Sequence, residues 1–299
     1  MRVGLAQVDG KWPNLALMKL STWHKQQGDT VERFIELGEY NKVYASKTFD
    51  FTPDSEYLPE GTVKGGTGYD LTTELSPEVE TCRPDYSLYP EWTAAIGFTT
   101  RGCVRNCPFC VVPHKEGRIR VVGDLYDFWD GQSEVILLDN NLTAAPWSHF
   151  ERLMLQLKQS GAKVDFSQGL DLRLITNAHA ELLAKIRLKK QIHFAWDNVS
   201  DEDAILQGLA VLGKHMPMSR VMLYVLIGYD STPEEDTYRV MTLKGLGVDP
   251  FVMPYNERDL YQRRFARWVN HKAIFKSVEW TQYGKAVVPS VHDTLPQPQ

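Results

Sequence analysis

Cysteine is scarce in this sequence, as are the other features of secreted or membrane-bound proteins. The 299-residue chain has four cysteines, too few and too unevenly placed for a disulfide-stapled secreted scaffold. No apolar run approaches the ~18 residues that a membrane-spanning helix needs, so we expect no membrane partner. The first residues lack the basic and long apolar regions of a secretory signal. We therefore expect a cytoplasmic protein.

An excess of positive charge is also missing. Lys and Arg number 33 against 38 Asp and Glu, which gives a formal net charge of -5. This balance excludes attraction of the whole chain to nucleic acid, so such a contact would need a local patch. What is present is an ordinary globular composition, 43% hydrophobic and 24% charged. The length allows one large domain or two.

The first 70 residues predict a small α/β domain. A helix is expected from Pro13 to Gly28. Strands are expected at residues 3–8, 31–35 and 42–49. Strand, helix and strand in this order favour parallel pairing. The domain ends in a tight loop that contains Gly65, Gly66 and Gly68.

Residues 71–92 are rich in Pro, Tyr and Glu, and we interpret them as a linker over the surface. Strands and helices then alternate over residues 93–257. Six strands are expected there, at residues 94–98, 134–139, 163–168, 191–196, 220–227 and 248–253. They predict a parallel sheet curled into a partial or full (β/α) barrel. Residues 258–299 are expected to form one long helix and a frayed tail, residues 287–299.

Three of the four cysteines, Cys103, Cys107 and Cys110, cluster directly after the first of these six strands. Cysteines used only for packing seldom lie so close together. With His114 they would make a tetrahedral zinc site. They suit an iron–sulfur cluster equally well, because soft thiolates bind both. The functional loops of such a sheet follow its strands, so their position favours the redox cluster over structural zinc.

The stretch C-V-R-N-C-P-F-C resembles the C-x-x-x-C-x-x-C motif of the radical S-adenosylmethionine (radical SAM) superfamily, including the aromatic Phe109 before the last cysteine. The resemblance implies a [4Fe–4S] cluster held by Cys103, Cys107 and Cys110, with one iron open to S-adenosylmethionine. It implies reductive cleavage of S-adenosylmethionine to methionine and a 5′-deoxyadenosyl radical, which abstracts hydrogen from a substrate. A flavodoxin or ferredoxin would supply the electron. The substrate candidates are a small molecule, a nucleotide or RNA.

Later strand ends carry polar residues where the resemblance places the cosubstrate. L-L-D-N-N ends the second barrel strand, where the family's G-G-E motif contacts the methionine amino group, although the glycines are absent here. S-Q-G-L-D-L-R ends the third strand, and L-I-G-Y-D follows the fifth, where the family binds adenine. The resemblance therefore implies cofactor contacts from Asp139, Asn140, Asn141, Gln168, Asp171, Arg173 and Gly228. Such strand-end residues are also common helix caps.

The N-terminal part and its G-G-T-G-Y loop resemble the cobalamin-binding-like domain that precedes some radical SAM barrels, in a group of mostly unassigned function. The resemblance covers residues 2–283. The D-x-H-x-x-G signature is missing, since Asp9 is followed by G-K-W-P-N, and His24 is expected on a helix surface. This argues against bound cobalamin, and so against the alternative of a cobalamin-dependent methyltransferase.

The tRNA methylthiotransferases, radical SAM enzymes with a similar barrel, hold a second cluster through three further cysteines. Residues 1–81 contain no cysteine, and Cys82 stands alone. This argues against sulfur insertion by that route.

A zinc-stabilised RNA-binding protein, with the three cysteines and His114 as ligands, stays open as a different class of function. A helix with several cationic residues could serve it: Arg263, Arg264, Arg267 and Lys272 alternate with Phe265 and Trp268. We prefer the interpretation of an amphipathic helix with its aromatic residues in the core. Strand ends are expected to present further residues to a substrate: Trp196, Asp197, Asn198, Tyr255 and Asn256. His193 and His114 are candidate acid–base groups.

Overall fold

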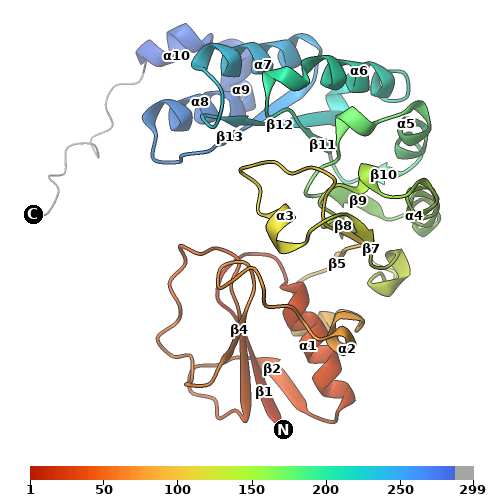
Figure 1. The fold of residues 1–299 in the computed structure, drawn as a ribbon, viewed down its shortest axis with the longest axis vertical. Coiled ribbons are helices and arrows are strands. Elements are labelled where there is room, and N and C mark those ends of the chain that lie inside the picture. The colour runs from red at the N-terminus through yellow and green to blue at the C-terminus, as the bar shows by residue number, and fades with distance from the viewer. Residues whose placement is uncertain (287–299) are drawn as a thin grey trace, which may run out of the picture. The chain divides into compact units, whose positions relative to one another are not determined.

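The computed structural model describes residues 1–286 and divides the chain into two compact units (Figure 1). The first unit holds Met1–Gln168 and Lys185–Lys189, and the second holds Gly169–Ala184 and the residues from Lys190 on. The division between the two units thus falls inside residues 93–257, the segment predicted to form the barrel. The boundaries drawn from sequence, at residues 70, 92 and 257, stay a prediction.

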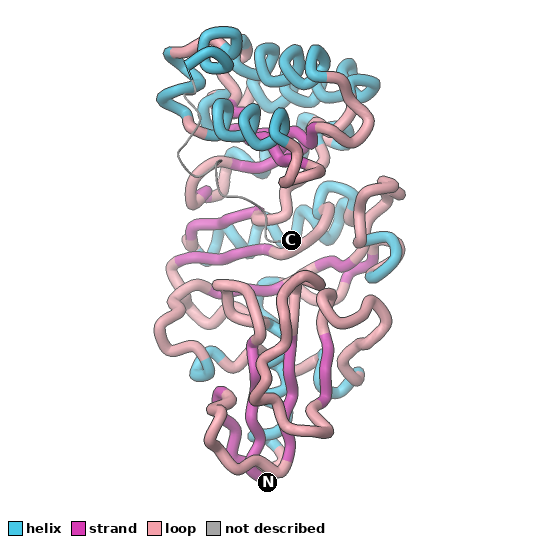
Figure 2. The backbone as a smooth tube through the Cα atoms, turned by 90° about the vertical axis from the view of Figure 1, so that its left-hand side faces the viewer, coloured by secondary structure: helices cyan, strands magenta, loops and turns pink. Residues whose placement is uncertain are grey.

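The first unit begins with a four-stranded parallel sheet in the order β2-β1-β3-β4 (Figure 2). Its strands are β1 Arg2–Gln7, β2 Thr30–Arg33, β3 Lys42–Ser46 and β4 Val63–Gly65. Helix α1 spans Leu15–Gln26, and the side chain of Asn14 caps it by accepting from Leu17 N. Gly28 follows with φ 81°, a left-handed conformation that ends the helix. The predicted strands, helix and parallel direction are confirmed.

A second parallel sheet of this unit has the order β10-β9-β8-β5. Its strands are β5 Ala95–Gly97, β8 Glu134–Leu137, β9 Lys163–Phe166 and β10 Arg187–Leu188. Helix α4 (Trp147–Ser160) joins β8 to β9. A two-stranded antiparallel pair, β6 (Thr100–Arg101) and β7 (Arg120–Val121), follows β5 and encloses the short helix α3 (Val112–Lys115). Short 3₁₀ helices are η1 Tyr86–Leu88, η2 Leu125–Asp127 and η3 Leu142–Ala144.

The second unit contains a parallel sheet in the order β11-β12-β13, with strands β11 Ile192–Ala195, β12 Val221–Ile227 and β13 Asp249–Pro254. Its helices are α5 Asn177–Ala184, α6 Glu202–Gly213, α7 Pro233–Gly245, α8 Leu260–Asn270, α9 Lys272–Ser277 and α10 Trp280–Ala286. Its 3₁₀ helices are η4 Leu172–Leu174, η5 Val199–Asp201 and η6 Met218–Arg220. The predicted tail, residues 287–299, lies outside the described residues.

The six strands expected after the linker are therefore present and parallel, within one or two residues of their predicted ends. They lie in two separate sheets of residues 1–286, and no closed barrel is shown. The mixed α/β class with parallel sheets is confirmed, while the barrel stays a prediction.

An apolar cluster joins the N-terminal sheet to the second sheet of the first unit. Leu5 of β1 and Leu17 of α1 pack in it with Ile96 of β5 and Ile136 of β8. The expected surface linker contributes to the same core, because its side chains Val79, Leu88 and Tyr89 are at most 6% exposed. The prediction that this segment lies on the surface was therefore wrong for these three residues. The linker contains helix α2 (Pro77–Glu80), and its apolar side chains fill the space beside α1.

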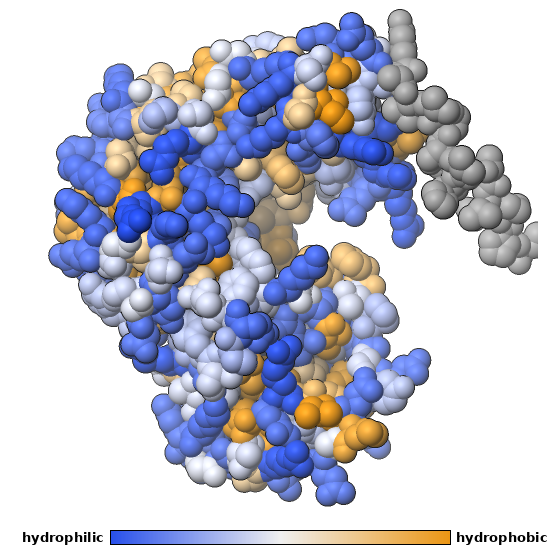
Figure 3. All heavy atoms as spheres, turned by 180° about the vertical axis from the view of Figure 1, so that it is seen from behind, coloured by the Kyte–Doolittle hydropathy of each residue, from blue (hydrophilic) through white to orange (hydrophobic). Residues whose placement is uncertain are grey.

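The single long C-terminal helix was also wrong. His271 has φ -88° and ψ 88°, which is not helical and separates α8 from α9. The amphipathic interpretation of α8 is confirmed, since Phe265 and Trp268 are 0% and 1% exposed. No helix among residues 1–286 is long and apolar enough to cross a bilayer. The face shown in Figure 3 is mainly hydrophilic, with apolar residues in scattered patches.

Candidate active site

The three clustered cysteines lie on the loop of residues 102–111, which connects β6 to α3. This loop follows the carboxyl end of β5 in the chain. Gly102 opens this loop with φ 80°, and a Cβ there would lie 2.4 Å from Arg118 O. The next residue, Cys103, donates its N–H to Gly117 O over 3.1 Å. The start of the loop is thus held closely against residues 117–118, an approach that requires glycine.

The cysteine thiols are half-buried, and none forms a disulfide. Two N–H groups donate to Cys103 Sγ: the backbone of Arg105 over 3.4 Å and the side-chain amide of Asn141 over 3.5 Å. Cys110 N donates to Cys107 O over 3.0 Å, which makes a tight turn between the last two cysteines. N–H donors to a cysteine sulfur are a common feature of metal sites, where such groups orient the ligand and offset its charge.

In the described part of the chain, no three Cys, His, Asp or Glu side chains converge as a preformed metal site. The donor set still fits an iron–sulfur cluster chemically, because three cysteines outside any disulfide share one loop and Cys103 Sγ already accepts N–H donors. His114 is exposed at the end of α3. The structure therefore does not bring His114 together with the cysteines as a zinc site. The support for a soft metal ion comes from the three cysteines, because sulfur ligands prefer such metals.

Asp139 ties the carboxyl end of β8 to that of β5. It is 3% exposed, and its carboxylate accepts hydrogen bonds from the backbone and hydroxyl groups of both Thr99 and Thr100, the shortest being 2.5 Å from Thr100 N. Burial raises the pKa of Asp139, and the hydrogen bonds from the two threonines oppose this shift. In this arrangement the carboxylate holds two strand ends together. Its predicted contact with S-adenosylmethionine stays a prediction.

His149 of α4 extends this network and fixes its proton directions. Arg152 Nη2, which can only donate, lies 3.1 Å from His149 Nδ1, so this nitrogen accepts and the proton sits on Nε2. His149 Nε2 then donates to Thr99 Oγ1 over 3.1 Å, and the threonine hydroxyl donates to Asp139. Burial and the charge of Arg152 lower the pKa of His149. A neutral imidazole is therefore part of the native arrangement.

Asn140 and Glu116 connect the same strand end to the cysteine loop. The amide of Asn140 donates to Glu116 Oε2 over 2.6 Å, and Gly102 N donates to the same oxygen over 3.0 Å. Lys115, next to Glu116, donates to Thr67 Oγ1 of the glycine-rich loop, and burial lowers the pKa of its ammonium group. The predicted residues Asp139, Asn140 and Asn141 are thus brought together with the cysteine segment.

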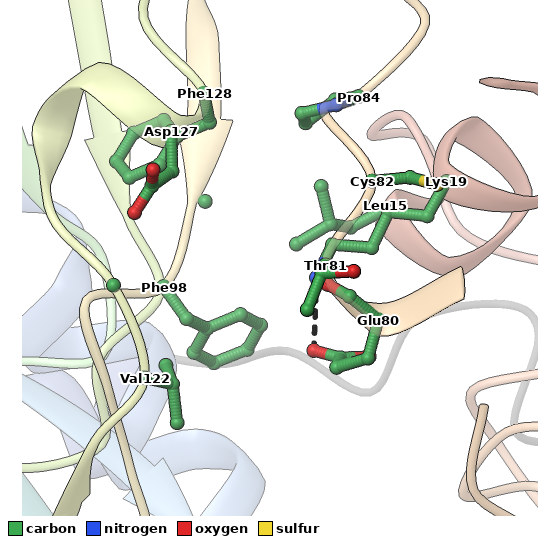
Figure 4. Close-up of a pocket in the computed structure, with 12 residues that line it drawn as sticks. Leu15, Lys19, Glu80, Thr81, Cys82, Pro84, Phe98, Val122, Asp127 and Phe128 are labelled. Atoms are coloured by element: carbon green, nitrogen blue, oxygen red, sulfur yellow. Dashed lines mark hydrogen bonds and ion pairs between the residues drawn. The ribbon is translucent and has the colours of Figure 1, made fainter. Parts of the chain in front are cut away.

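A pocket of about 200 Å³ lies beside this region, between α1, α2 and the carboxyl end of β5 (Figure 4). One wall is apolar, with Phe98 and Phe128, and the other carries the ion pair between Lys19 and Glu80, 2.8 Å apart. Cys82 lines the pocket and donates to Glu78 O over 3.3 Å, and burial raises the pKa of its thiol. Cys82 therefore stays a protonated, hydrogen-bonded thiol apart from the cysteine loop.

The remaining predicted cofactor residues are placed differently. Gln168 is exposed at the end of the first unit. In the second unit, Arg173 Nε donates to Asp171 Oδ1 over 2.7 Å and Arg173 Nη1 pairs with Asp201 over 2.7 Å. Gly228 has φ 74°, and a Cβ there would meet the buried Gln262 side chain. Asp171 and Arg173 thus have structural partners, and the contacts of all four residues with a cosubstrate stay predictions.

The expected substrate-facing position of Trp196 was wrong. Its side chain is 0% exposed, and its indole N–H donates to Asn198 O over 2.8 Å, so the ring belongs to the core of the second unit. Asp197 is half-buried, and its desolvation raises the pKa of its carboxyl group. Tyr255 and Asn256 are exposed after β13, and their contact with a substrate stays a prediction. The ring of His193 lies 5.5 Å from that of Tyr224.

The expected surface position of His24 was wrong as well. Its side chain is 1% exposed. Nδ1 contacts Asp29 Oδ2 at 2.6 Å and Nε2 contacts Tyr44 OH at 3.0 Å. Both ring nitrogens of His24 thus have protein partners, and neither faces a metal.

Sequence reasoning missed Glu116, Arg101, His149 and the two threonines. Thr99 and Thr100 stand directly between β5 and the cysteine motif, and this position was the one signal in the sequence that could have drawn attention to them. Glu116 follows the last cysteine by six residues and has no local pattern that distinguishes it from an exposed glutamate. Only the tertiary structure identifies its partners.

Comparison with known proteins adds one relative, and no protein-family model matches the chain. Over 133 residues the chain is 29% identical to the tRNA-2-methylthio-N(6)-dimethylallyladenosine synthase of Flavobacterium psychrophilum. The match covers 40% of this chain and 25% of that protein, so the chain spans far less than two thirds of this relative. Together with the cysteine motif, this distant likeness supports a relation to the radical SAM superfamily of enzymes. It does not identify the reaction or the substrate.

Proposed function

We propose that this protein is a radical SAM enzyme in which Cys103, Cys107 and Cys110 hold a [4Fe–4S] cluster. The observation that carries the proposal is the placement of the cysteine loop, which follows β5 and receives the Asn141 amide on Cys103 Sγ. Polar groups of two adjacent parallel strands thus meet at one sheet edge, where α/β enzymes bind cofactors. When bound and reduced, the cluster supplies the electron that cleaves S-adenosylmethionine to methionine and a 5′-deoxyadenosyl radical.

The residues of the first unit have distinct roles in this proposal. Cys103, Cys107 and Cys110 bind iron as thiolates. Asn141 and the Arg105 N–H donate to Cys103 Sγ and offset its negative charge. Asn140 offers its carbonyl oxygen as the acceptor that the methionine ammonium group requires.

Asp139 acts indirectly in this proposal, by holding the end of β8 against Thr99 and Thr100. Gln168, Asp171, Arg173 and Gly228 are proposed to contact the ribose, carboxylate or adenine of S-adenosylmethionine. The six parallel strands β5, β8, β9, β11, β12 and β13 supply the number and direction that a partial barrel needs. We propose that they form it.

The substrate class is less defined. The name of the Flavobacterium relative describes modification of a tRNA nucleoside, which makes RNA or a nucleotide a candidate substrate here. Residues 1–81 contain no cysteine, so a second cluster held there by three cysteines is not part of the proposal. A flavodoxin or ferredoxin is proposed as the electron donor.

Anaerobic reconstitution tests the proposal. The purified chain is incubated with iron and sulfide, desalted, and examined for bound iron and for its visible spectrum. The proposal expects a brown protein with a broad band near ~400 nm that dithionite bleaches, as thiolate-ligated clusters show. Stoichiometric zinc in a colourless protein that takes up no iron would favour the zinc-stabilised alternative and refute the radical SAM assignment.

A further inference from the structure

Glu116 gathers donors from three segments around the cysteine loop. Its Oε1 accepts from Arg101 Nη1 over 3.0 Å, and its Oε2 accepts from Gly102 N over 3.0 Å and from Asn140 Nδ2 over 2.6 Å. These donors come from β6, from the residue before Cys103 and from the end of β8. The side chain is 12% exposed, so water competes little for the carboxylate.

This arrangement determines where the first cysteine lies. Hydrogen bonds to a carboxylate are shorter and stronger than those between neutral groups, and a carboxylate with several donors is held in one position. The neighbouring Gly117 accepts from Cys103 N over 3.1 Å. Glu116 and Gly117 therefore accept hydrogen bonds from two successive N–H groups, those of Gly102 and Cys103.

Arg101 extends the arrangement toward the N-terminal sheet. Its Nη2 pairs with Glu80 Oε1 over 3.4 Å, and its guanidinium lies 3.7 Å from the ring centroid of Phe98. Glu80 in turn pairs with Lys19 of α1 over 2.8 Å. A continuous series of charged side chains thus runs from Lys19, on the wall of the pocket in Figure 4, to Glu116 at the cysteine loop.

We propose that Glu116 is a positioning residue for the cluster ligands, and that Arg101 couples it to α1 and α2 through Glu80. The proposal rests on the proposed function for the identity of the bound group. Its geometric content, that Glu116 holds the loop at Gly102 and Cys103, applies equally to the metal-free chain.

The first experiment measures the loop without metal. The apo protein and its Glu116→Ala, Glu116→Gln and Glu151→Ala variants are treated with iodoacetamide, and alkylation of Cys103 is followed by mass spectrometry. Glu151 is an exposed residue of α4 and serves as the matched control. Glu116→Ala is expected to alkylate several-fold faster at Cys103, because the loop loses its anchor. Glu116→Gln keeps one acceptor oxygen, so its alkylation rate at Cys103 is expected to lie between those of Glu116→Ala and the wild type.

The second experiment measures cluster retention in the reconstituted proteins. Removal of a residue that orients metal ligands typically costs 10- to 100-fold in metal affinity. Glu116→Ala is therefore expected to lose iron to a chelator about 10-fold faster than the wild type and Glu151→Ala. Glu80→Gln, which removes the negative charge that Arg101 pairs with on α2 but leaves Glu116 in place, is expected to show a smaller increase.

The outcomes separate the two proposals. Folded Glu116→Ala with wild-type alkylation and chelation rates would overturn the positioning role. A wild type that takes up no iron would refute the proposed function, while the alkylation rates would still decide whether Glu116 holds the loop. Should Glu116→Ala fail to fold, as judged by circular dichroism, Glu116→Gln provides the decision: wild-type rates in that variant would also overturn the proposal.

Discussion

The side-chain amide of Asn141 donates a hydrogen bond to Cys103 Sγ over 3.5 Å. The two residues are 38 positions apart, and the bond joins the end of β8 to the cysteine loop that follows β5 and β6. This contact connects the cysteine motif, whose chemistry is recognisable from sequence, to the end of β8, whose role is not. Replacement of Asn141 therefore measures what one hydrogen bond contributes to the environment of the Cys103 sulfur.

The first prediction concerns that contact. Hydrogen bonds to cysteine sulfur raise the reduction potential of iron–sulfur clusters by stabilising the more negative reduced state. Asn141→Ala is therefore expected to lower the potential of the reconstituted cluster, as measured by a redox titration followed by electron paramagnetic resonance. Asn106→Ala, an exposed change in the same loop, should leave the potential unchanged. Equal potentials for Asn141→Ala and the wild type would show that the contact does not act on the cluster.

The second prediction concerns Asp139. Replacement by Asn keeps one acceptor oxygen for the donors at Oδ1 but sets an NH₂ group, in the place of Oδ2, against the N–H of Thr99. Because unsatisfied buried donors cost about 1–3 kcal/mol, Asp139→Asn should lower the free energy of unfolding by about 2 kcal/mol. Urea titration of the apo protein measures this loss. No change in the denaturation midpoint would mean that the strand-end network adds no stability.

The third prediction concerns pH. The pKa of His149 in the folded protein lies below its ordinary value of 6.5, so the unfolded chain binds this proton more readily. The contribution of neutral His149 to stability is complete above pH 6.5 and is lost as the pH falls from there toward the lowered pKa. Thermal unfolding between pH 7.5 and 5 should show this loss.

His149→Gln separates this effect from other titrations. Glutamine can accept from Arg152 and donate to Thr99 as the neutral imidazole does, but it does not titrate. The variant should therefore lose less stability on acidification than the wild type. His179→Gln should also reduce the loss, since burial lowers the pKa of His179 as well, and it leaves the His149 step in place, so the two effects should add in the double variant. Identical pH profiles for His149→Gln and the wild type would exclude the imidazole as the source.

The fourth prediction concerns Gly228. Its φ of 74° is unfavourable for alanine, and a Cβ would lie 2.1 Å from Gln262 Nε2. Gln262 would have to move and would lose the hydrogen bond that its Oε1 accepts from Asn256 N. Gly228→Ala should therefore cost about 2–3 kcal/mol, the sum of backbone strain and one broken contact. Gly131→Ala, with φ 87° and open space at the Cβ, should cost about 1 kcal/mol. Thermal melts that rank the two glycines equally would contradict the steric explanation.

Much of the fold follows from local pattern. The alternation of short apolar runs with amphipathic segments predicts the strands, because each strand interior is continuously apolar in a parallel sheet. The linker shows the limit of this approach. Its polar composition predicts a surface segment, yet Leu88 and Tyr89 are buried because they pack in the same apolar cluster as the buried side chains of α1.

The candidate site was predictable to the same limited extent. The spacing of the cysteines identifies the loop, and the order of the strands identifies Asn141 as a neighbour. The partners of Glu116 were not predictable, since they come from β6 and β8 and meet only after folding. Trp196 was misplaced because a strand-end residue faces either a cavity or the helix layer, and residue type does not distinguish the two.

The most direct test of the account is production of 5′-deoxyadenosine. The reconstituted protein is reduced with dithionite under nitrogen, mixed with S-adenosylmethionine, and analysed by liquid chromatography and mass spectrometry. The account predicts 5′-deoxyadenosine and methionine from the wild type and from Cys82→Ala, and none from Cys103→Ala, Cys107→Ala or Cys110→Ala. A wild-type protein with an intact, reduced cluster that yields no 5′-deoxyadenosine would contradict it.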